Sequence, residues 1–355
     1  MVLCIARNFE NNMRSLKIIF LSHSFAPAIG GIEASSVLLA DVFAKRGHEV
    51  IIMTMTKGPN TAGLPYKVVR NPGLLLMLKY HAWADIVYEN NPCLRLGWPK
   101  LLFGNPSVIA LHTWITRSDG SVSLIDKIKL YWLAKANKVI AVSKEIQNRC
   151  WPKAIVIGNS FNSDLFKIWH LNRKKDFVFL GRLVSDKGAD LAIRAFADMA
   201  FFNPLASLAD ADLTIIGAGP EQVHLENLAA ALPDPNRIKF VGSLTGNELV
   251  DELNRHSFMF IPSIWEEPFG IVALEGIACG LIPIASDGGG LPDAVGRAGV
   301  MFRRGKLDSL IQVSTNLVTS DILQSKCLSA APAHLDRFSS STVTNAFINV
   351  LETVV

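Results

Sequence analysis

Two glutamates with a glycine between them are the residues of this chain whose spacing most directly indicates chemistry. Glu267 stands before a predicted helix over residues 271–279, and Glu275 lies eight residues further on, about two turns along the chain. Gly270 opens the helix and lets a ligand approach the backbone. The free amides of a helix N-terminus hold an anion, whereas carboxylates accept hydrogen bonds from hydroxyl groups. The segment therefore predicts a ligand with hydroxyl groups at two places and negative charge between them, such as a nucleotide sugar.

The alternative interpretation treats Glu266, Glu267 and Glu275 as ordinary helix charges. Glu275 argues against it, because its neighbours in the predicted helix are apolar. A carboxylate in such surroundings requires a partner or a function. The segment continues through a predicted buried strand over residues 281–285 and ends in the loop G-G-G-L-P.

Two basic residues follow the first predicted strand of the second half, residues 176–180. The loop after this strand reads G-R-L-V-S-D-K-G and carries Arg182 and Lys187. Two fixed cations at the end of a strand suit a diphosphate, and the alternative is a pair of surface charges. A later predicted strand, residues 238–241, leads to Leu244, which we expect beside the nucleotide base.

A nicotinamide site is not supported. The loop G-A-G-P after the predicted strand 213–216 has Gln222 where a dinucleotide fingerprint needs its third glycine. The sequence Asp210-Ala211-Asp212 resembles a metal-binding D-x-D, but it precedes its strand and has no evident neighbouring ligands. We therefore expect no metal ion and no cofactor.

The first half begins with a strand, a glycine loop, a helix and a second strand, which is a βαβ unit of the nucleotide-binding kind. Gly30 and Gly31 stand at the helix entrance, where amides can face a phosphate, although a glycine pair alone is more often a plain turn. His112 directly follows the predicted strand 107–111. Parallel sheets carry their chemistry beyond the strand C-termini, so His112 is a candidate, with an ordinary loop histidine as the alternative.

These motifs together resemble those of a known family. E-P-F-G-I-V-A-L-E, G-L-I-P-I-A and G-G-G-L-P-D resemble the E-x7-E signature of the retaining glycosyltransferases of family 4, and G-R-L-V-S-D-K-G is similar to that family's G-R-L-x-x-x-K-G. The resemblance implies an α/β protein of the GT-B fold, with two Rossmann-like domains facing each other across a cleft. The family's N-G-V-D is replaced here by N-S-F-N at residues 159–162, which leaves these positions without an assigned role.

The resemblance and the charges together assign the site. Glu275 is expected to hold the ribose, Glu267 the sugar hydroxyls, and His112 the donor sugar. The predicted catalytic residues are His112, Glu267, Arg182 and Lys187. The predicted substrate-binding residues are Gly30, Gly31, Arg182, Lys187, Leu244, Glu267, Phe269, Gly270, Ile271 and Glu275.

The composition predicts a cytoplasmic chain of two domains. Its 355 residues are 50% hydrophobic, which is enough for two cores. The five cysteines show no C-x-x-C spacing, so neither a zinc site nor a disulfide framework is indicated, and no apolar run reaches the roughly 18 residues of a membrane span. The expected divisions are a disordered lead at 1–14, with Met13 as an alternative start, an acceptor-side domain at 15–170, a nucleotide-sugar domain at 171–338, and a helix at 339–355 that crosses back to the first domain.

The charge is distributed unevenly. Residues 1–170 carry 20 Lys and Arg against 10 Asp and Glu, whereas residues 171–355 carry 15 against 21. Lysines and aromatic residues are mixed between residues 126 and 144, which predicts contact of Lys127, Lys129 and Lys135 with anionic lipid headgroups at the inner face of the membrane. The alternative is a solvated helix face, and binding to nucleic acid is not expected.

The predicted function is transfer of a sugar, with retention, from a nucleoside diphosphate sugar to a hydroxyl of a glycan or lipid-linked acceptor. By resemblance this transfer serves bacterial surface polysaccharide synthesis. The alternatives are a sugar-nucleotide epimerase of the same fold and a non-catalytic sugar-nucleotide-binding subunit. A pyridoxal-dependent phosphorylase would need a Schiff-base lysine, which the sequence does not identify.

Overall fold

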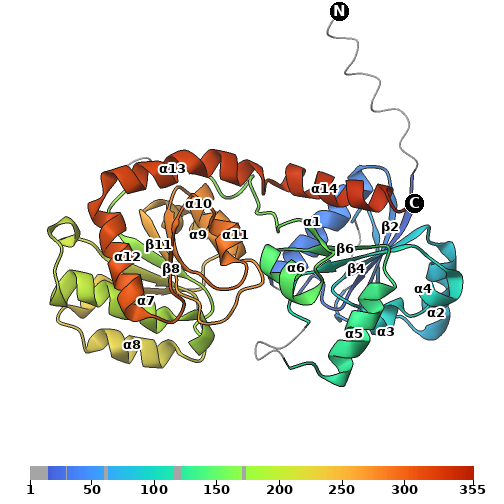
Figure 1. The fold of residues 1–355 in the computed structure, drawn as a ribbon, viewed down its shortest axis with the longest axis horizontal. Coiled ribbons are helices and arrows are strands. Elements are labelled where there is room, and N and C mark those ends of the chain that lie inside the picture. Colours follow the sequence, from blue (N-terminus) through green and yellow to red (C-terminus); the bar gives the residue numbers. More distant parts are fainter. Residues whose placement is uncertain (1–14, 29, 60–62, 116–120, 170–172) are drawn as a thin grey trace, which may run out of the picture. The chain divides into compact units, whose positions relative to one another are not determined.

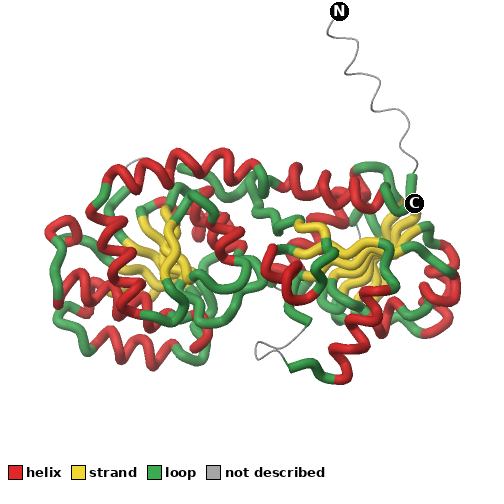
Figure 2. Tube along the Cα trace, viewed as in Figure 1, coloured by secondary structure: helices red, strands yellow, loops and turns green. Residues whose placement is uncertain are grey.

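The protein consists of two compact α/β units, each built on a parallel sheet, in a computed structural model. The structure describes residues 15–355 except 29, 60–62, 116–120 and 170–172, so the predicted lead at 1–14 lies outside the described residues. The first unit contains the described residues up to Ile140, Lys153–Ile155 and Thr344–Val355, and the second contains Ala141–Pro152 and Val156–Val343. Helices lie on both sides of the strands in each unit (Figure 2).

The first unit has a seven-stranded sheet in the order β3-β2-β1-β4-β5-β6-β7. Its strands are β1 Lys17–Ser22, β2 Glu49–Thr54, β3 Lys67–Arg70, β4 Ile86–Asn90, β5 Ser107–Leu111, β6 Lys138–Ala141 and β7 Ile155–Val156. The helices along this part of the chain are α1 Gly31–Lys45, α2 Leu74–Trp83, α3 Leu94–Gly97, α4 Lys100–Phe103, α5 Leu124–Ala134 and α6 Lys144–Cys150 (Figure 1). The central strands β1, β4 and β5 are almost wholly buried, which explains the apolar runs of β1 and β5, whereas β4 also buries Glu89 and Asn90.

The second unit has a six-stranded sheet in the order β10-β9-β8-β11-β12-β13. Its strands are β8 Phe177–Leu180, β9 Leu213–Ile216, β10 Ile238–Gly242, β11 Phe258–Ile261, β12 Ile282–Ser286 and β13 Val300–Phe302. The helices of the second half are α7 Ala189–Ala197, α8 Gln222–Ala230, α9 Gly246–Asn254, α10 Ile271–Ala278, α11 Leu291–Val295, α12 Leu307–Thr319, α13 Asp321–Asp336 and α14 Ser340–Glu352. A stack of Phe177 on Phe260, with ring centroids 4.8 Å apart, lies at the centre of its core.

The strand order reverses direction once in each sheet. In the first sheet the chain moves outward from β1 to β3 and then returns to the other side of β1 with β4. In the second sheet it does the same with β8 and β11. In open parallel sheets, ligands bind beyond the carboxyl ends of the strands at such a switch point. The loops after β1 and β4, and those after β8 and β11, are therefore the places to examine.

Two stretches that we expect from their sequence to be mainly loop are more ordered in the structure. Residues 57–80, where the sequence suggests a loop with at most a short turn or helix at 74–78, contain β3 and most of α2. The polar segment before the last helix, expected as a loop, is the 16-residue helix α13, which accommodates Pro332. The lysines at 126–144 are divided among α5, β6 and the start of α6, and β6 lies within the strand that the sequence predicts at 138–142.

The final helix α14 is divided between the two units. Its residues up to Val343 belong to the second unit, and those from Thr344 onward belong to the first. Within that unit Phe347 lies edge-on to Tyr88, with ring centroids 6.1 Å apart. No helix in the described ranges is both long and apolar enough to cross a lipid bilayer.

Candidate active site

The carboxyl edge of the second sheet is formed by loops that hold one another through backbone hydrogen bonds. The amide of Leu183, after β8, donates to the carbonyl of Ala218, after β9, at 3.0 Å. The amides of Ile264 and Trp265, after β11, donate to the carbonyl of Asp186 at 2.8 and 3.0 Å. The loop between β8 and α7 is therefore fixed from both sides, at the switch point of the sheet.

Two residues that the sequence assigned to different parts of the ligand are joined in the structure. The ammonium of Lys187 forms an ion pair with Oε1 of Glu267, and the hydroxyl of Ser263 donates to the same oxygen at 2.9 Å. Ser263 is buried, and its own carbonyl accepts from the Ser286 hydroxyl at 2.9 Å. Lys187 is therefore not an isolated cation, and Glu267 is a carboxylate held in one orientation. Ser263 is not among the predicted site residues, although it opens the same segment.

The glycine run after β12 lets two loops approach closely behind Glu267. The amide of Gly290 donates to the carbonyl of Glu267 at 2.7 Å. Gly289 has a φ of +64°, and a Cβ added there would lie 2.3 Å from the same carbonyl oxygen. The G-G-G-L-P motif thus fixes the backbone that carries Glu267, which gives it a positioning role rather than a direct role toward a ligand.

The second basic residue of the β8 loop behaves differently from the first. Arg182 is exposed and has no ion-pair partner among the residues that the structure describes. It is therefore available to an anion, and its role toward a diphosphate stays a prediction. Leu244 is partly exposed in the loop after β10, two strands from β8, where it remains a candidate neighbour of a base.

The start of α10 lies on the same edge of the sheet. Gly270 caps it with a φ of +105°, and a Cβ there would lie 2.5 Å from a methyl group of Leu291, so no other residue fits without rearrangement. Ile271 is partly exposed. Phe269 was predicted to bind substrate, but its side chain is buried against Phe338, with ring centroids 5.4 Å apart. Only the backbone of Phe269 is therefore left for a ligand.

Glu275 lies in the second turn of α10 and has the surroundings that the sequence predicted. It is only partly exposed, its helix neighbours Leu274 and Gly276 are buried, and its carboxylate has no hydrogen bond or ion pair within the described part of the chain. Burial raises the pKa of Glu275 from 4.5 to about 7. A carboxylate of this kind is stabilised when a ligand donates hydroxyl groups to it.

The candidates of the first unit lie at the carboxyl edge of its own sheet. His112 follows β5 and is buried, and its backbone amide donates to the side chain of Asn91 at 2.8 Å. Asn91 follows β4 and has a φ of +62°, and its backbone amide donates a hydrogen bond to the carbonyl of Ala110 at 2.8 Å. His112 is thus rigidly positioned beside the switch point of this sheet, although its role stays a prediction.

The glycine pair predicted to face a phosphate has an acidic neighbour. Gly31 is the first residue of α1, and Gly30 is its cap. A Cβ added to Gly30 would lie 2.3 Å from a carboxylate oxygen of Glu33, so this carboxylate lies over the helix entrance. An acidic side chain in the first turn stabilises a helix through its dipole, and an anionic ligand at Gly30 would require Glu33 to move.

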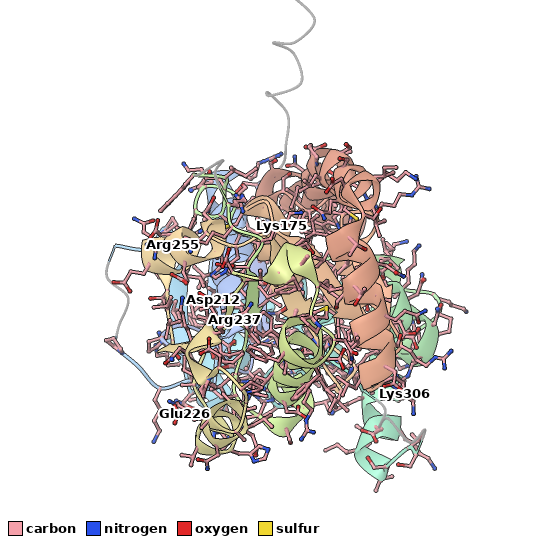
Figure 3. The ribbon with its side chains drawn as sticks, turned by 90° about the vertical axis from the view of Figure 1, so that its left-hand side faces the viewer. Lys175, Asp212, Glu226, Arg237, Arg255 and Lys306 are labelled. Carbon is pink, nitrogen blue, oxygen red and sulfur yellow. The ribbon has the colours of Figure 1, made fainter. Side chains whose placement is uncertain are left out.

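The D-x-D sequence lies at the opposite edge of the second sheet from the candidate site. Asp212 immediately precedes β9, and its carboxylate pairs with Lys239. Figure 3 shows Asp212 near Arg237, on a face that also carries Lys175 and Arg255. No group of three or more His, Cys, Asp or Glu side chains in the described ranges is arranged to hold a metal ion.

Comparison with known proteins places this geometry in a family. Residues 162–333 match the glycosyl transferases group 1. An uncharacterized glycosyltransferase of Methanocaldococcus jannaschii is 34% identical over 329 residues, which cover 79% of this chain and 83% of that protein. The phosphatidylinositol N-acetylglucosaminyltransferase gpi3 subunit of Schizosaccharomyces pombe is 24% identical over 336 residues, covering 84% of this chain and 72% of that protein.

Solved structures share the fold. Crystal structures of Anabaena HepE in complex with UDP and with UDP-glucose match with TM-scores of 0.80 and 0.76 at 21% identity, covering 95% of this chain and 100% of that one. The fold class is therefore GT-B, as the sequence predicted. The chain belongs to the group 1 glycosyltransferases, and its enzyme class is that of the glycosyltransferases.

Proposed function

We propose that this enzyme transfers a sugar from a uridine diphosphate sugar to a hydroxyl of a lipid-linked acceptor, with retention of the anomeric configuration. The Lys187–Glu267 pair, held by Ser263 at the switch point of the second sheet, carries the proposal. A cation and a carboxylate fixed side by side suit a ligand in which a phosphate adjoins sugar hydroxyls.

The choice of a uridine nucleotide is supported by the Anabaena structures, which hold UDP and UDP-glucose in this fold. In this chain Glu275 is assigned to the ribose hydroxyls, because it is a carboxylate with apolar helix neighbours and without a protein partner in the described residues. Leu244 is assigned to the neighbourhood of the base. The uridine assignment is the finer part of the proposal, since the sequence itself indicates only a nucleoside diphosphate.

The charges on the β8 loop supply the means of catalysis. Negative charge develops on the leaving diphosphate, and Arg182 and Lys187, with the N-terminal amides of α10, are placed to stabilise it. We assign no metal to this step. His112 of the first unit is assigned to orient the donor sugar.

The state of Glu267 bears on the route by which retention would be achieved. Its Oε1 already accepts hydrogen bonds from both Lys187 and Ser263, which makes it a poor nucleophile toward an anomeric carbon. No other carboxylate is assigned to attack. We therefore propose departure and attack on the same face of the sugar, with the leaving phosphate helping to deprotonate the acceptor, rather than a two-carboxylate scheme.

The acceptor is proposed to be lipid-linked. The curated relative from Schizosaccharomyces pombe is named for phosphatidylinositol, whereas the motifs suggested bacterial surface polysaccharide synthesis. Both interpretations place the acceptor hydroxyl on a lipid. Lys127 and Lys135, which are exposed, and Lys129, which is partly exposed, are assigned to an anionic membrane surface.

Release of UDP, followed with and without acceptor, tests the proposal. UDP-glucose, UDP-galactose and UDP-N-acetylglucosamine are each incubated with vesicles containing phosphatidylinositol or a polyprenyl-diphosphate-linked sugar. We expect one donor to release UDP only when one of these acceptors is present. Conversion of a donor to its epimer without acceptor would indicate an epimerase, and binding of UDP without any turnover would indicate a binding subunit.

A further inference from the structure

Three neighbouring helices of the first unit expose apolar side chains while burying polar ones. In a soluble domain the opposite arrangement is the rule, and an extended exposed apolar surface marks a contact with another phase or molecule. The helices are α2, α4 and α5. Their exposed large apolar residues are Leu74, Leu75, Leu76, Leu101, Leu102, Phe103, Leu124, Ile125, Ile128 and Tyr131.

The inversion is clearest in α4, where Lys100 is 2% exposed and Leu102 is 66% exposed. The ammonium of Lys100 pairs with Glu89 of β4 at 2.5 Å and donates to the hydroxyl of Ser107 of β5 at 3.0 Å, and both of these strand residues are buried. The indole of Trp132 donates to the same carboxylate at 2.8 Å. This buried network fixes the orientation of the four-residue helix. It leaves the three residues after Lys100 facing away from the core.

The two adjacent helices repeat the pattern. In α2, His81 is 0% exposed and its Nδ1 lies 2.9 Å from the carbonyl of Met77, whereas Leu75 is 83% exposed. In α5, Asp126 is 6% exposed because it forms a capping box with Ser123, whereas Leu124 is 76% exposed. In both helices the polar group is drawn inward by a local hydrogen bond, and leucine remains outside.

The three helices that carry these apolar side chains are neighbours in the fold. α2 contacts α4 directly. α4 contacts α5 through Lys100, whose ammonium lies 4.2 Å from the ring centroid of Trp132. Figure 1 shows α2 and α4 at the outer edge of the first unit and α5 at its lower edge, with α3 between them. Cations accompany them, since Lys79 of α2, Lys127 of α5 and Lys135 at the end of α5 are all exposed.

We propose that this face, Leu74–Leu76 with Leu101–Phe103 and the start of α5, inserts its apolar side chains into the hydrocarbon of an anionic bilayer. Apolar side chains then leave water, while the lysines at the margin reach the headgroups. A lipid surface fits better than a protein, because the exposed charges of these helices are basic and suit a uniformly anionic partner. The inference deepens the membrane contact of the proposed function, which otherwise rests on lysines alone.

Insertion and adsorption differ in their response to salt. Binding through lysines alone fades as salt rises, whereas burial of apolar surface persists. We expect the intact chain to sediment with vesicles containing phosphatidylglycerol in low salt and to retain a substantial bound fraction in high salt. The triple change of Leu101, Leu102 and Phe103 to Ser is expected to lower the partition coefficient about 10-fold or more in high salt.

The matched control changes three exposed apolar residues of the second unit, Phe202, Val223 and Ile322, to Ser, and is expected to leave the partition coefficient unchanged. Calorimetry with UDP on both variants checks that the donor unit is intact. Acyl-chain bromine quenching, compared between the wild type and Trp98→Phe, reports depth, because Trp98 lies two residues before the start of α4.

The outcomes separate two failures. Three results would overturn insertion without affecting UDP binding. They are wild-type binding that disappears in high salt, absence of bromine quenching, and equal partition coefficients for the two triple variants. Absence of binding to any vesicle would overturn it too. A wild-type chain that binds vesicles in high salt but does not bind UDP would support insertion and contradict the proposed donor.

Discussion

Replacement of Glu275 by Gln is the perturbation whose effect follows most directly from the structure. Burial raises the pKa of Glu275 from 4.5 to about 7. Between pH 4.5 and about pH 7, therefore, the carboxyl of Glu275 is mostly protonated in the folded chain and mostly ionised in the unfolded chain. Glutamine keeps the size and hydrogen-bonding capacity of the protonated form but cannot ionise. The variant thus isolates the free energy of the buried charge.

The raised pKa of Glu275 makes the stability of the folded chain depend on pH. Because the pKa is raised in the folded state, this residue's contribution to stability is full below pH 4.5 and is lost as the pH rises through about 7. At about 1.4 kcal/mol for each pKa unit, the difference between the two pKa values corresponds to roughly 3–4 kcal/mol. We therefore expect Glu275→Gln to be more stable than the wild type by about that amount at about pH 8, and equal to it at about pH 4.

Denaturant unfolding of both proteins over this pH range, followed by circular dichroism, measures the effect. Glu266→Gln is the control. Burial works to raise the pKa of Glu266, but hydrogen bonds from Arg149 and Arg304 outweigh it and lower that pKa. Its contribution is therefore present above the unfolded pKa and lost as the pH falls, so Glu266→Gln is expected to destabilise the protein at about pH 8.

Binding of UDP provides the complementary measurement. Ribose hydroxyls donate to an ionised carboxylate, so we expect UDP to bind more tightly as the pH rises through about 7 and to bind Glu275→Gln more weakly by about 1–3 kcal/mol. A stability difference between wild type and variant that does not change with pH would refute the buried-charge argument. Unchanged UDP affinity in the folded variant would refute the ribose assignment.

Three further predictions follow from the same geometry. Lys187→Ala and Arg182→Ala are each expected to lower the turnover number at least about 100-fold in a UDP-release assay, and near-normal rates in both would place the diphosphate elsewhere. Turnover is expected to survive EDTA, and a loss restored by manganese would contradict the assignment of the charge stabilisation to these two cations. Glu89→Leu leaves the ammonium of Lys100 buried without its partner and is expected to destabilise the first unit by about 3–5 kcal/mol in thermal unfolding, whereas a change below about 1 kcal/mol would show that water reaches this ion pair.

The sequence predicted the frame of the molecule well because buried parallel strands read as short apolar runs. The bounds of β5 and β9 agree with the predicted residues, and α10 begins at the predicted Ile271. The helix α13 was missed because its apolar residues are few and Pro332 lies inside it, and a proline normally argues against a helix. Tertiary packing decided this element.

Contacts between distant residues were the part that the sequence could not supply. Lys187 and Glu267 were each assigned to the site, but they are 80 residues apart, and their ion pair depends on how two loops meet at the sheet edge. Likewise, Lys100 followed by two leucines reads as an ordinary amphipathic turn. Only the structure shows that the lysine is buried against Glu89 and that the leucines face outward.

The central claim is sugar transfer from a uridine diphosphate sugar to a lipid by the Lys187–Glu267 site. The most direct measurement incubates a UDP-sugar labelled in the sugar with acceptor vesicles and follows the label into the organic phase, for the wild type and for Lys187→Ala. We expect label to enter the lipid with the wild type, in the anomeric configuration of the donor, and about 100-fold more slowly with the variant. Three results would contradict this claim. The label could stay in water as free or epimerised sugar, the product could have the inverted configuration, or the two proteins could have equal rates.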